Sequence, residues 1–255
     1  MVGMSVVSTP PAVVGDRREA RRQARRAALL GAALRIVSRV GVAELTMQAV
    51  ADRVGCSVGT VYTHFPSKGA LVAELQNQAV LRIVQSLQSV RSRAAGRYAA
   101  VGLDPSERAA AELLLYGEFI IACWDEFPEE SHLLLSVLAE RDRVVPEADL
   151  GPVLGATMVL LALGRDAVHD AVEAEVIAPG PEMDRVVVGA TAILGVLLTS
   201  HLGHIDATAF DHHRLTRTLW HDLLGGWGMS RGDLDRAAAE VDALALDGPL
   251  APPVE

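Results

Sequence analysis

The sequence contains few cysteines and few aromatic residues. Cys56 and Cys123 are its only cysteines, too few for a disulfide framework or a four-thiolate zinc site. Aromatic residues make up 4% of the 255 residues, whereas alanine and leucine dominate, a bias that favours helices over a β-sandwich. We therefore expect an all-α protein that works in a reducing cytoplasm.

The chain also lacks an uninterrupted apolar run of membrane-spanning length. The longest runs, 186–200 and 150–164, are shorter than the roughly 20 residues that a helix needs to cross a bilayer. Near the N-terminus the first charges follow the apolar stretch, and Pro10 and Pro11 interrupt it. This is the wrong order for a signal peptide, so we expect a protein without a membrane partner.

Several chemical motifs are missing as well. We find no phosphate-binding loop, no nucleophile elbow and no zinc-protease motif, and therefore expect neither an enzyme nor a cofactor. The late histidines are expected at a helix surface or an interface rather than on a metal; they are His201, His204, His212, His213 and His221. Cys56 is expected to be a small buried residue rather than an oxidant sensor.

Charge is distributed unevenly along the chain. Residues 1–97 contain 14 Lys and Arg against 5 Asp and Glu, a net charge of +9. Residues 98–255 contain 9 against 27, a net charge of −18. A basic module followed by an acidic one is typical of nucleic-acid binding at one end, with the other end repelled by the phosphates. The alternative is an accidental asymmetry between solvated surfaces.

Composition and helical periodicity predict the order of the segments. Asp16, with Glu19 three residues later, resembles a capping box that opens the first helix, and Gly41 can end it. We expect a flexible arm at 1–15, a helical domain at 16–66, a connecting helix at 67–92, a second helical domain at 93–247 that begins with a linker at 93–104, and a disordered tail at 248–255.

The segment from Thr46 to Phe65 has the spacing of a helix-turn-helix. Thr46 can cap a short helix, and Gly55 supplies the positive φ that a tight turn requires. Ser57 can cap a second helix, whose Val61 and Phe65 lie four residues apart and can pack on the first. In this motif the second helix enters the major groove of DNA.

Residues left on the outer face of the motif are the candidates for DNA contact. Gly59 lets the backbone approach DNA, and the small or hydroxyl side chains suit base edges and thymine methyls. Tyr62 and His64 suit phosphate oxygens, and Lys68 can add its charge together with the amides of the next helix. The full predicted set is Thr46, Ser57, Val58, Gly59, Thr60, Tyr62, Thr63, His64 and Lys68.

The basic segment before the motif allows more than one interpretation. Six arginines, Arg17, Arg18, Arg21, Arg22, Arg25 and Arg26, precede it and increase the expectation of DNA binding. Any one of them could instead belong to a solvated helix face. Residues 16–26 could be helical or a loose arm that reaches the minor groove.

Residues 27–75 resemble the DNA-binding domain of the tetracycline-repressor (TetR) family of bacterial transcriptional regulators. The residues that carry the resemblance are Gly41, Thr46, Ala51, Gly55, Ser57, Gly59, Thr60, Val61, Tyr62, Phe65, Pro66, Ser67, Lys68 and Leu71. The resemblance covers about the first third of the chain. It implies an all-α homodimer with a ligand-binding C-terminal domain, in which a small molecule relieves repression at an operator in double-stranded DNA.

The remainder of the chain is less specific. Two late segments are apolar on more than one face, so each must cover its own core and something else; the resemblance implies that 184–226 forms a four-helix dimer interface. We expect a pocket for a hydrophobic effector between helices at 105–127, 131–143 and 152–176. Its predicted walls are Tyr116, Phe119, Ile120, Trp124, Phe127 and Met158.

Two other classes of function compete with a ligand-responsive repressor. A helical small-molecule-binding protein or enzyme, in which the helix-turn-helix is only a packing unit, predicts titratable residues gathered in the pocket at 105–176. An architectural DNA-binding protein without an effector predicts a filled C-terminal core without a cavity.

Overall fold

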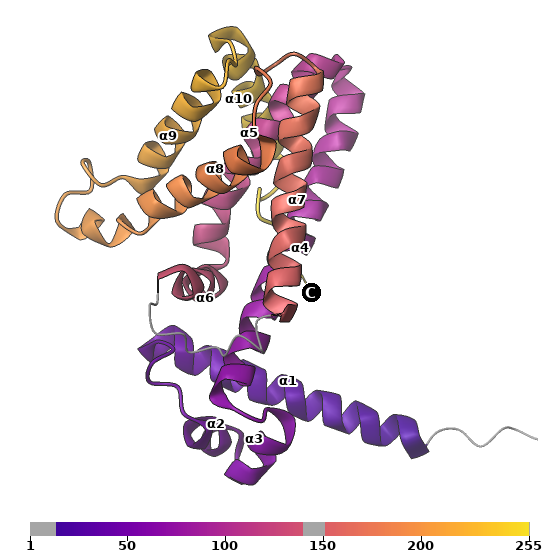
Figure 1. The fold of residues 1–255 in the computed structure, drawn as a ribbon, viewed down its shortest axis with the longest axis vertical. Coiled ribbons are helices and arrows are strands. Elements are labelled where there is room, and N and C mark those ends of the chain that lie inside the picture. The colour runs from indigo at the N-terminus through magenta and orange to yellow at the C-terminus, as the bar shows by residue number, and fades with distance from the viewer. Residues whose placement is uncertain (1–13, 140–150, 255) are drawn as a thin grey trace, which may run out of the picture. The chain divides into compact units, whose positions relative to one another are not determined.

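The computed structural model describes residues 14–139 and 151–254, and within these ranges every regular element is helical (Figure 1). The expected all-α fold is confirmed. The expected arm at 1–15 lies mostly outside the described residues. The helices are α1 (Val14–Val40), α2 (Met47–Val54), α3 (Val58–His64), α4 (Lys68–Val101), α5 (Pro105–Glu126), α6 (Pro128–Ala139), α7 (Gly151–Glu173), α8 (Glu182–Leu197), α9 (His212–Gly226) and α10 (Arg231–Leu246), with a 3₁₀ turn at Ser200–His204.

The chain divides into two compact units, residues 1–71 and 72–255. The first unit contains α1, α2, α3 and the first residues of α4, and the second contains the rest of α4 and every later helix. A single continuous helix therefore belongs to both units. This division falls five residues after the predicted border between residues 66 and 67.

Helix α1 begins earlier than the sequence suggested. It runs from Val14 to Val40, so Asp16 lies inside the first turn rather than at the cap, and the predicted capping box is wrong. Residues 16–26 are helical, which decides against the loose arm. Gly41 follows with φ +83°, the left-handed conformation that ends many helices.

Helix α5 is the central element of the second unit. It contacts α6, α7, α8, α9 and α10, and the labels of Figure 1 show α7, α8 and α10 around it. The helix starts with a complete capping box between Asp104 and Glu107 and with Pro105 at its first position. Residues on nearly every side of α5 are buried, as expected for a helix that is enclosed by others.

One tryptophan holds three of these helices together. Trp220 of α9 is 2% exposed, and its indole Nε1 donates a hydrogen bond of 3.2 Å to the carbonyl of Leu114 in α5. A Cβ atom at Gly117 would lie 2.2 Å from that nitrogen, and a Cβ atom at Gly189 of α8 would lie 2.8 Å from the indole ring. The two glycines therefore create the space that the indole fills.

The predicted linker at 93–104 is wrong, because α4 continues to Val101. Ala94 and Tyr98 are buried, with exposed fractions of 0% and 1%. Gly96 and the small residues around it suggested a break, since a glycine in a helix costs about 1 kcal/mol relative to alanine. Tyr98 belongs to the hydrophobic core of the second unit, and its burial there outweighs that local cost.

The predicted disorder of the tail at 248–255 is also wrong for the residues that are described. Leu250 and Ala251 are buried, and the Ser86 hydroxyl of α4 donates a 2.7 Å hydrogen bond to the carbonyl of Pro252. The Arg93 guanidinium donates to the carbonyls of residues 248 and 249. A proline-rich segment cannot satisfy its carbonyls within itself, and here side chains of α4 supply the missing donors.

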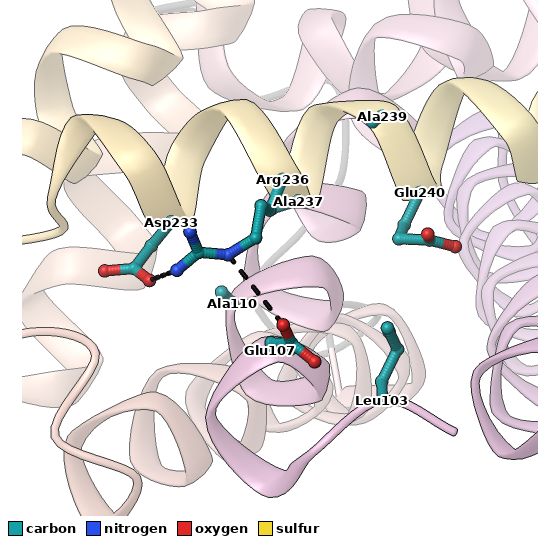
Figure 2. Close-up of a pocket in the computed structure, with 8 residues that line it drawn as sticks. All are labelled: Leu103, Glu107, Ala110, Asp233, Arg236, Ala237, Ala239 and Glu240. Carbon is teal, nitrogen blue, oxygen red and sulfur yellow. Dashed lines mark hydrogen bonds and ion pairs between the residues drawn. The ribbon is translucent and has the colours of Figure 1, made fainter. Parts of the chain in front are cut away.

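A small polar cleft lies between α5 and α10 (Figure 2). Arg236 forms ion pairs with Asp233 at 2.6 Å and with Glu107 at 3.9 Å, and Glu107 also completes the cap of α5. Glu240, the other charged residue of the cleft, pairs with Arg97 of α4 at 3.5 Å. The charged side chains of this cleft therefore have partners that join α10 to α5 and α4.

Two helices of the second unit are apolar enough, by length and composition, to cross a membrane. They are Gly151–Glu173 and the stretch Glu182–His204, each 23 residues long, longer than the strictly apolar runs that the sequence analysis considered. In the most apolar 18-residue part of each stretch, 28% and 22% of the residues are buried. Both stretches thus leave apolar side chains uncovered within the described part of the chain.

Candidate DNA-binding surface and effector cavity

Helix α2 begins and ends as the sequence suggested. The Thr46 hydroxyl accepts a 3.1 Å hydrogen bond from the backbone N–H of Ala49, which caps the helix. Gly55 ends it with φ +69° and ψ +46°, where a side chain would be strained. The next N–H, that of Cys56, returns to the carbonyl of Ala51 at 3.0 Å, so the turn is closed by backbone hydrogen bonds.

Helix α3 follows immediately and packs through two side chains. The Ser57 hydroxyl accepts a 3.3 Å hydrogen bond from the N–H of Thr60, which caps the helix. Val61 and Phe65 are 0% and 1% exposed, and α3 contacts α2. The predicted inward face of the second helix is therefore confirmed. Cys56, in the turn, is only half-buried.

The opposite face of α3 is open to solvent. Gly59 and Thr63 are exposed, the Tyr62 side chain is 51% exposed, and Val58 and Thr60 are half-buried. The remaining members of the predicted set are the exposed Thr46 and Ser57 and the half-buried His64 and Lys68. All nine residues lie in the first unit, on or beside the motif. Their contacts with DNA stay a prediction.

Arginines of α1 place positive charge at the end of α3. The Arg26 guanidinium lies 4.9 Å from the centroid of the Phe65 ring, within the range of a cation–π contact. Burial, followed by the charges of Arg22, Arg26 and Arg25, lowers the pKa of His64. The His64 imidazole is therefore neutral at pH 7, and an approaching phosphate would meet the arginine charges beside it.

Lys68 is positioned by a backbone contact. Its Nζ donates a 2.8 Å hydrogen bond to the carbonyl of Ala43, in the segment between α1 and α2. An ammonium group has three donors, so two can still reach a phosphate. Lys68 is also the first residue of α4, where free helix amides attract anions.

Replacement of Gly59 by alanine tests how closely α3 approaches DNA. A Cβ atom there would meet only the Ser57 Oγ, at 3.8 Å, so the folded protein can accept it. We expect equal or slightly higher stability, by up to about 1 kcal/mol, and at least about tenfold weaker DNA binding, because the added methyl group faces the duplex. Urea unfolding and fluorescence anisotropy at fixed salt measure the two effects.

Gly96→Ala is the matched control, because Gly96 lies in α4 and a Cβ atom there would have no neighbour within 4 Å. We expect it to leave DNA affinity unchanged. Undiminished affinity of the Gly59→Ala protein would mean that α3 does not lie against DNA at this residue.

The second unit contains an apolar cavity of about 250 Å³. Its walls come from α4, α5, α6, α7 and α8. Four of the six predicted wall residues line it, namely Tyr116, Phe119, Ile120 and Trp124. The predicted set contains no residue of α4 or α8, although both helices contribute walls.

The other two predicted wall residues lie elsewhere. Phe127 is 4% exposed and belongs to the hydrophobic core of the second unit, and Met158 is 53% exposed on α7. Met158 follows Thr157, which does line the cavity, and one residue along an α-helix turns the side chain by about 100°, here away from the cavity. The periodicity of a helix that is apolar on several faces could not indicate which face is inward.

No Asp, Glu, Lys, Arg or His lines the cavity among the described residues. The hydroxyls of Ser131 and Thr157 donate to backbone carbonyls at 3.0 and 2.8 Å, so both are already engaged. The lining groups that could ionise are Tyr116 and Cys123, and burial raises the pKa of both. The walls are thus uncharged at neutral pH.

Several observations together define the class of protein. Two short helices meet at a left-handed glycine, the second presents a polar face to solvent, and arginines lie beside it. This is the arrangement of a helix-turn-helix, the class of motif whose second helix enters the major groove of DNA. Residues 29–75 match the family model of bacterial regulatory proteins, tetR family, so the resemblance noted in the sequence is confirmed over these residues.

A curated relative matches over part of the chain. The HTH-type transcriptional repressor KstR of Mycobacterium tuberculosis is 40% identical over 78 residues, which are 31% of this chain and 34% of that repressor. The match thus spans about a third of the length of KstR.

Solved structures resemble the fold of most of the chain. SmeT, the repressor of the Stenotrophomonas maltophilia multidrug efflux pump SmeDEF, has a TM-score of 0.56 at 18% identity, over 82% of this chain and 92% of SmeT. A TetR transcription regulator from Haloarcula marismortui has a TM-score of 0.57 at 16% identity, over 80% and 98%. A SmeT–triclosan complex has a TM-score of 0.52 at 19% identity, over 83% and 94%.

Proposed function

We propose that this protein is a ligand-responsive transcriptional repressor that leaves its operator when a hydrophobic small molecule binds the second unit. The observation that carries the proposal is the TetR-type helix-turn-helix, with its polar face exposed beside the arginines of α1. The apolar cavity in the other unit supplies a place for the effector. Such a repressor works in the cytoplasm, in contact with the genome.

The cavity selects the chemistry of the effector. Its walls are aliphatic and aromatic and carry no formal charge, and an ionised ligand group buried there would lack a partner, which is costly. The effector is therefore a neutral, largely apolar molecule with few polar groups. Triclosan, the compound in the SmeT complex, is an aromatic compound of this general kind and serves as a first probe.

The helix α4 connects the two sites within one continuous segment. It begins at Lys68, in the predicted DNA-contacting set, and its Val80 and Ile83 line the cavity. A ligand against Val80 and Ile83 can favour a different position of α4 and thereby of the helix-turn-helix that precedes it. Two recognition helices must lie about 34–36 Å apart to read both half-sites of an operator, so a small shift in a dimer removes bivalent binding.

The partner that this mechanism requires is a second copy of the chain, bound through 184–226. Exposed positions three or four residues apart form one stripe along α8 and the residue that follows it, through Val188, Thr191, Gly195 and Leu198. A Cβ atom at Gly195 would have no neighbour within 4 Å, so a second helix can approach closely there. Pairing of this stripe with its symmetry mate would cover the apolar surface that α8 leaves open.

The experiment begins with the DNA that flanks the gene of this protein, because repressors of this kind commonly control themselves or their neighbours. A mobility shift identifies the operator, and a thermal-shift screen of neutral apolar compounds, triclosan included, identifies an effector. We expect the effector to weaken operator binding about 5–150-fold, the usual range of allosteric coupling. By reciprocity, operator DNA must weaken effector binding by the same factor.

Calorimetry with and without operator measures this reciprocity. Ala190→Phe is the control variant, because Ala190 lines the cavity and a phenyl group would fill part of it. We expect this variant to bind operator normally and to lose the response to the effector. Equal effector affinity with and without operator would rule out the mechanism for that compound.

The competing functions find less support. An enzyme site in the cavity would need groups that can transfer protons at neutral pH, whereas burial raises the pKa of the cavity-lining Tyr116 and Cys123 away from neutrality. An architectural DNA-binding protein has no need of a cavity in its second unit, and the cavity therefore favours a ligand-responsive regulator.

A further inference from the structure

Three potential metal ligands meet where the end of α5 lies beside the start of α9. The Asp125 carboxylate presents one oxygen to each of two neighbouring imidazoles. Its Oδ2 lies 3.2 Å from the Nε2 of His213, and its Oδ1 lies 3.7 Å from the Nε2 of His212. One ligand atom from each residue can be chosen so that all three lie within 4.8 Å of one another.

The two imidazoles are held side by side by the start of α9. Asp211 caps the helix by accepting a 3.1 Å hydrogen bond from the N–H of Arg214, which fixes His212 and His213 in the first turn. Their ring centroids lie 4.2 Å apart, with 34° between the ring planes. Both rings therefore direct an Nε2 atom toward the same carboxylate.

One of these nitrogen atoms is buried without a hydrogen-bond partner in the described part of the chain. The Nε2 of His212 is buried and has no hydrogen-bond partner among the described residues, and at 3.7 Å the Asp125 oxygen is too distant to provide one. A buried ring nitrogen without a partner is uncommon because its desolvation is not compensated. A metal ion bound to the lone pair would satisfy it.

From this geometry we propose that Asp125, His212 and His213 form a binding site for a divalent transition-metal ion, with Zn²⁺ as the preferred occupant. Two imidazole nitrogens and one carboxylate oxygen are ligands that Zn²⁺ favours, and zinc sites with three protein ligands leave a fourth position for water. Metal–ligand distances of about 2.1 Å place tetrahedral ligand atoms about 3.4 Å apart. Each Nε2 atom lies 3.2 or 3.7 Å from the nearer of the two Asp125 oxygens. With a single oxygen as ligand, the three atoms lie within 4.8 Å of one another, so they must move closer together to bind one ion.

Small side-chain movements complete the site. His213 and Asp125 are about half exposed, with side-chain exposures of 51% and 48%, so both can rotate without disturbing the core and the ion can enter from solvent. The amides at the start of α9 oppose a cation, since a helix N-terminus carries partial positive charge. The carboxylates of Asp125 and of the capping residue Asp211 counter that effect.

The bound ion would join α5 to α9. Asp125 directly follows Cys123 and Trp124, which both line the cavity, and α9 carries Trp220 into the core. The site would therefore stabilise the second unit at the edge of the cavity wall. This proposal does not depend on the proposed function, because it concerns an ion that the folded second unit binds with or without DNA.

The test is a zinc titration of the full chain, freed of any purification tag and of metal, in competition with a chromophoric chelator. We expect one Zn²⁺ per chain with a dissociation constant in the micromolar range or below. Asp125→Asn and His213→Gln should each weaken binding at least about tenfold, the scale on which ligand-shell changes act. His204→Gln is the matched control, since the His204 ring contacts the backbone carbonyl of His201 outside the cluster.

Two further measurements make the result specific. Co²⁺ bound in place of Zn²⁺ should give the intense visible absorption of a four-coordinate site in wild type and in His204→Gln, and lose it in the other variants. Zn²⁺ should raise the thermal unfolding midpoint of wild type and of His204→Gln but not that of the other variants, because an ion that binds only the folded state stabilises it. Circular dichroism of the metal-free variants confirms that each one folds.

Two results would overturn the proposal. One is the absence of saturable zinc binding in the micromolar range by the wild-type protein. The other is equal zinc affinity in wild type, Asp125→Asn and His213→Gln, which would assign the binding to other histidines of the chain.

Discussion

Substitution of two exposed residues of the α8 stripe by arginine should make the protein monomeric and strongly weaken its binding to the operator. Val188 and Leu198 are 52% and 46% exposed and lie on the stripe that we propose as the dimer interface. Two buried arginines in each copy, opposite their symmetry mates, would be desolvated and mutually repulsive. We expect sedimentation to show a monomer for Val188→Arg/Leu198→Arg, and operator affinity to fall by about 10²–10⁴, the usual contribution of bivalency.

The choice of residue decides whether this experiment probes the interface. Leu197 is 0% exposed and packs inside its own protomer, so an arginine there would disrupt the core, although the sequence places Leu197 next to Leu198. Leu246→Arg is the control, since Leu246 is 89% exposed at the end of α10 and should leave the dimer intact. A Val188→Arg/Leu198→Arg protein that stayed dimeric would place the interface elsewhere, and Met158→Arg on α7 would be examined next.

Replacement of Gly117 by alanine should destabilise the second unit by about 3 kcal/mol or more. The new Cβ atom would lie 2.2 Å from the Nε1 of Trp220, which is far inside contact distance. The indole is enclosed on its other side by Gly189, so it must leave its site and lose both its burial and its hydrogen bond to Leu114. Removal of a buried tryptophan costs about 3–5 kcal/mol.

Urea unfolding followed by tryptophan fluorescence measures this effect, because all three tryptophans, Trp124, Trp220 and Trp227, lie in the second unit. Gly96→Ala is again the control and should be neutral or stabilising. Trp220→Leu combined with Gly117→Ala should cost less than the sum of the two single changes, because the smaller side chain relieves the overlap. Strict additivity would show that the two residues do not interact.

Much of the fold could be predicted because its signals are local. The helix-turn-helix depends on caps and on one turn, and Thr46, Gly55 and Ser57 act as the sequence suggested. The stripe of Val61 and Phe65 is short and unambiguous, since only one face of that helix is apolar. These signals need no knowledge of distant residues.

The effector cavity could be predicted only in part. The large side chains of α5 were correctly predicted to line the cavity. Val80, Val187 and Leu194 also line it, but they belong to α4 and α8, which supplied none of the predicted wall residues. Phe127 and Met158 were assigned to the cavity because α5 and α7 are apolar on several sides, and periodicity then gives no unique inward direction. Which face turns inward is decided by the neighbouring helices.

The remaining errors arose where long-range contacts override local preference. Residues 93–101 were expected to leave the helix, and 248–254 were expected to be disordered, yet Arg93 of the first segment donates hydrogen bonds to backbone carbonyls of the second. Asp125 is 87 residues from His212 along the chain, so no spacing rule brings them together. A surface or interface position was predicted for His212 and His213, and the structure places both in the first turn of α9, His213 half exposed, with their Nε2 atoms near one carboxylate.

The amino-acid sequence by itself determined the helical class, the position and caps of the helix-turn-helix, and the separation of a basic end from an acidic one. These depend on residue composition and on contacts between residues a few positions apart. The tertiary structure decided which side chains line the cavity, which face of α8 is left for a partner, where the C-terminal tail lies, and that Asp125 meets two histidines. Each of these depends on residues far apart in the chain, whose proximity arises only when the helices pack.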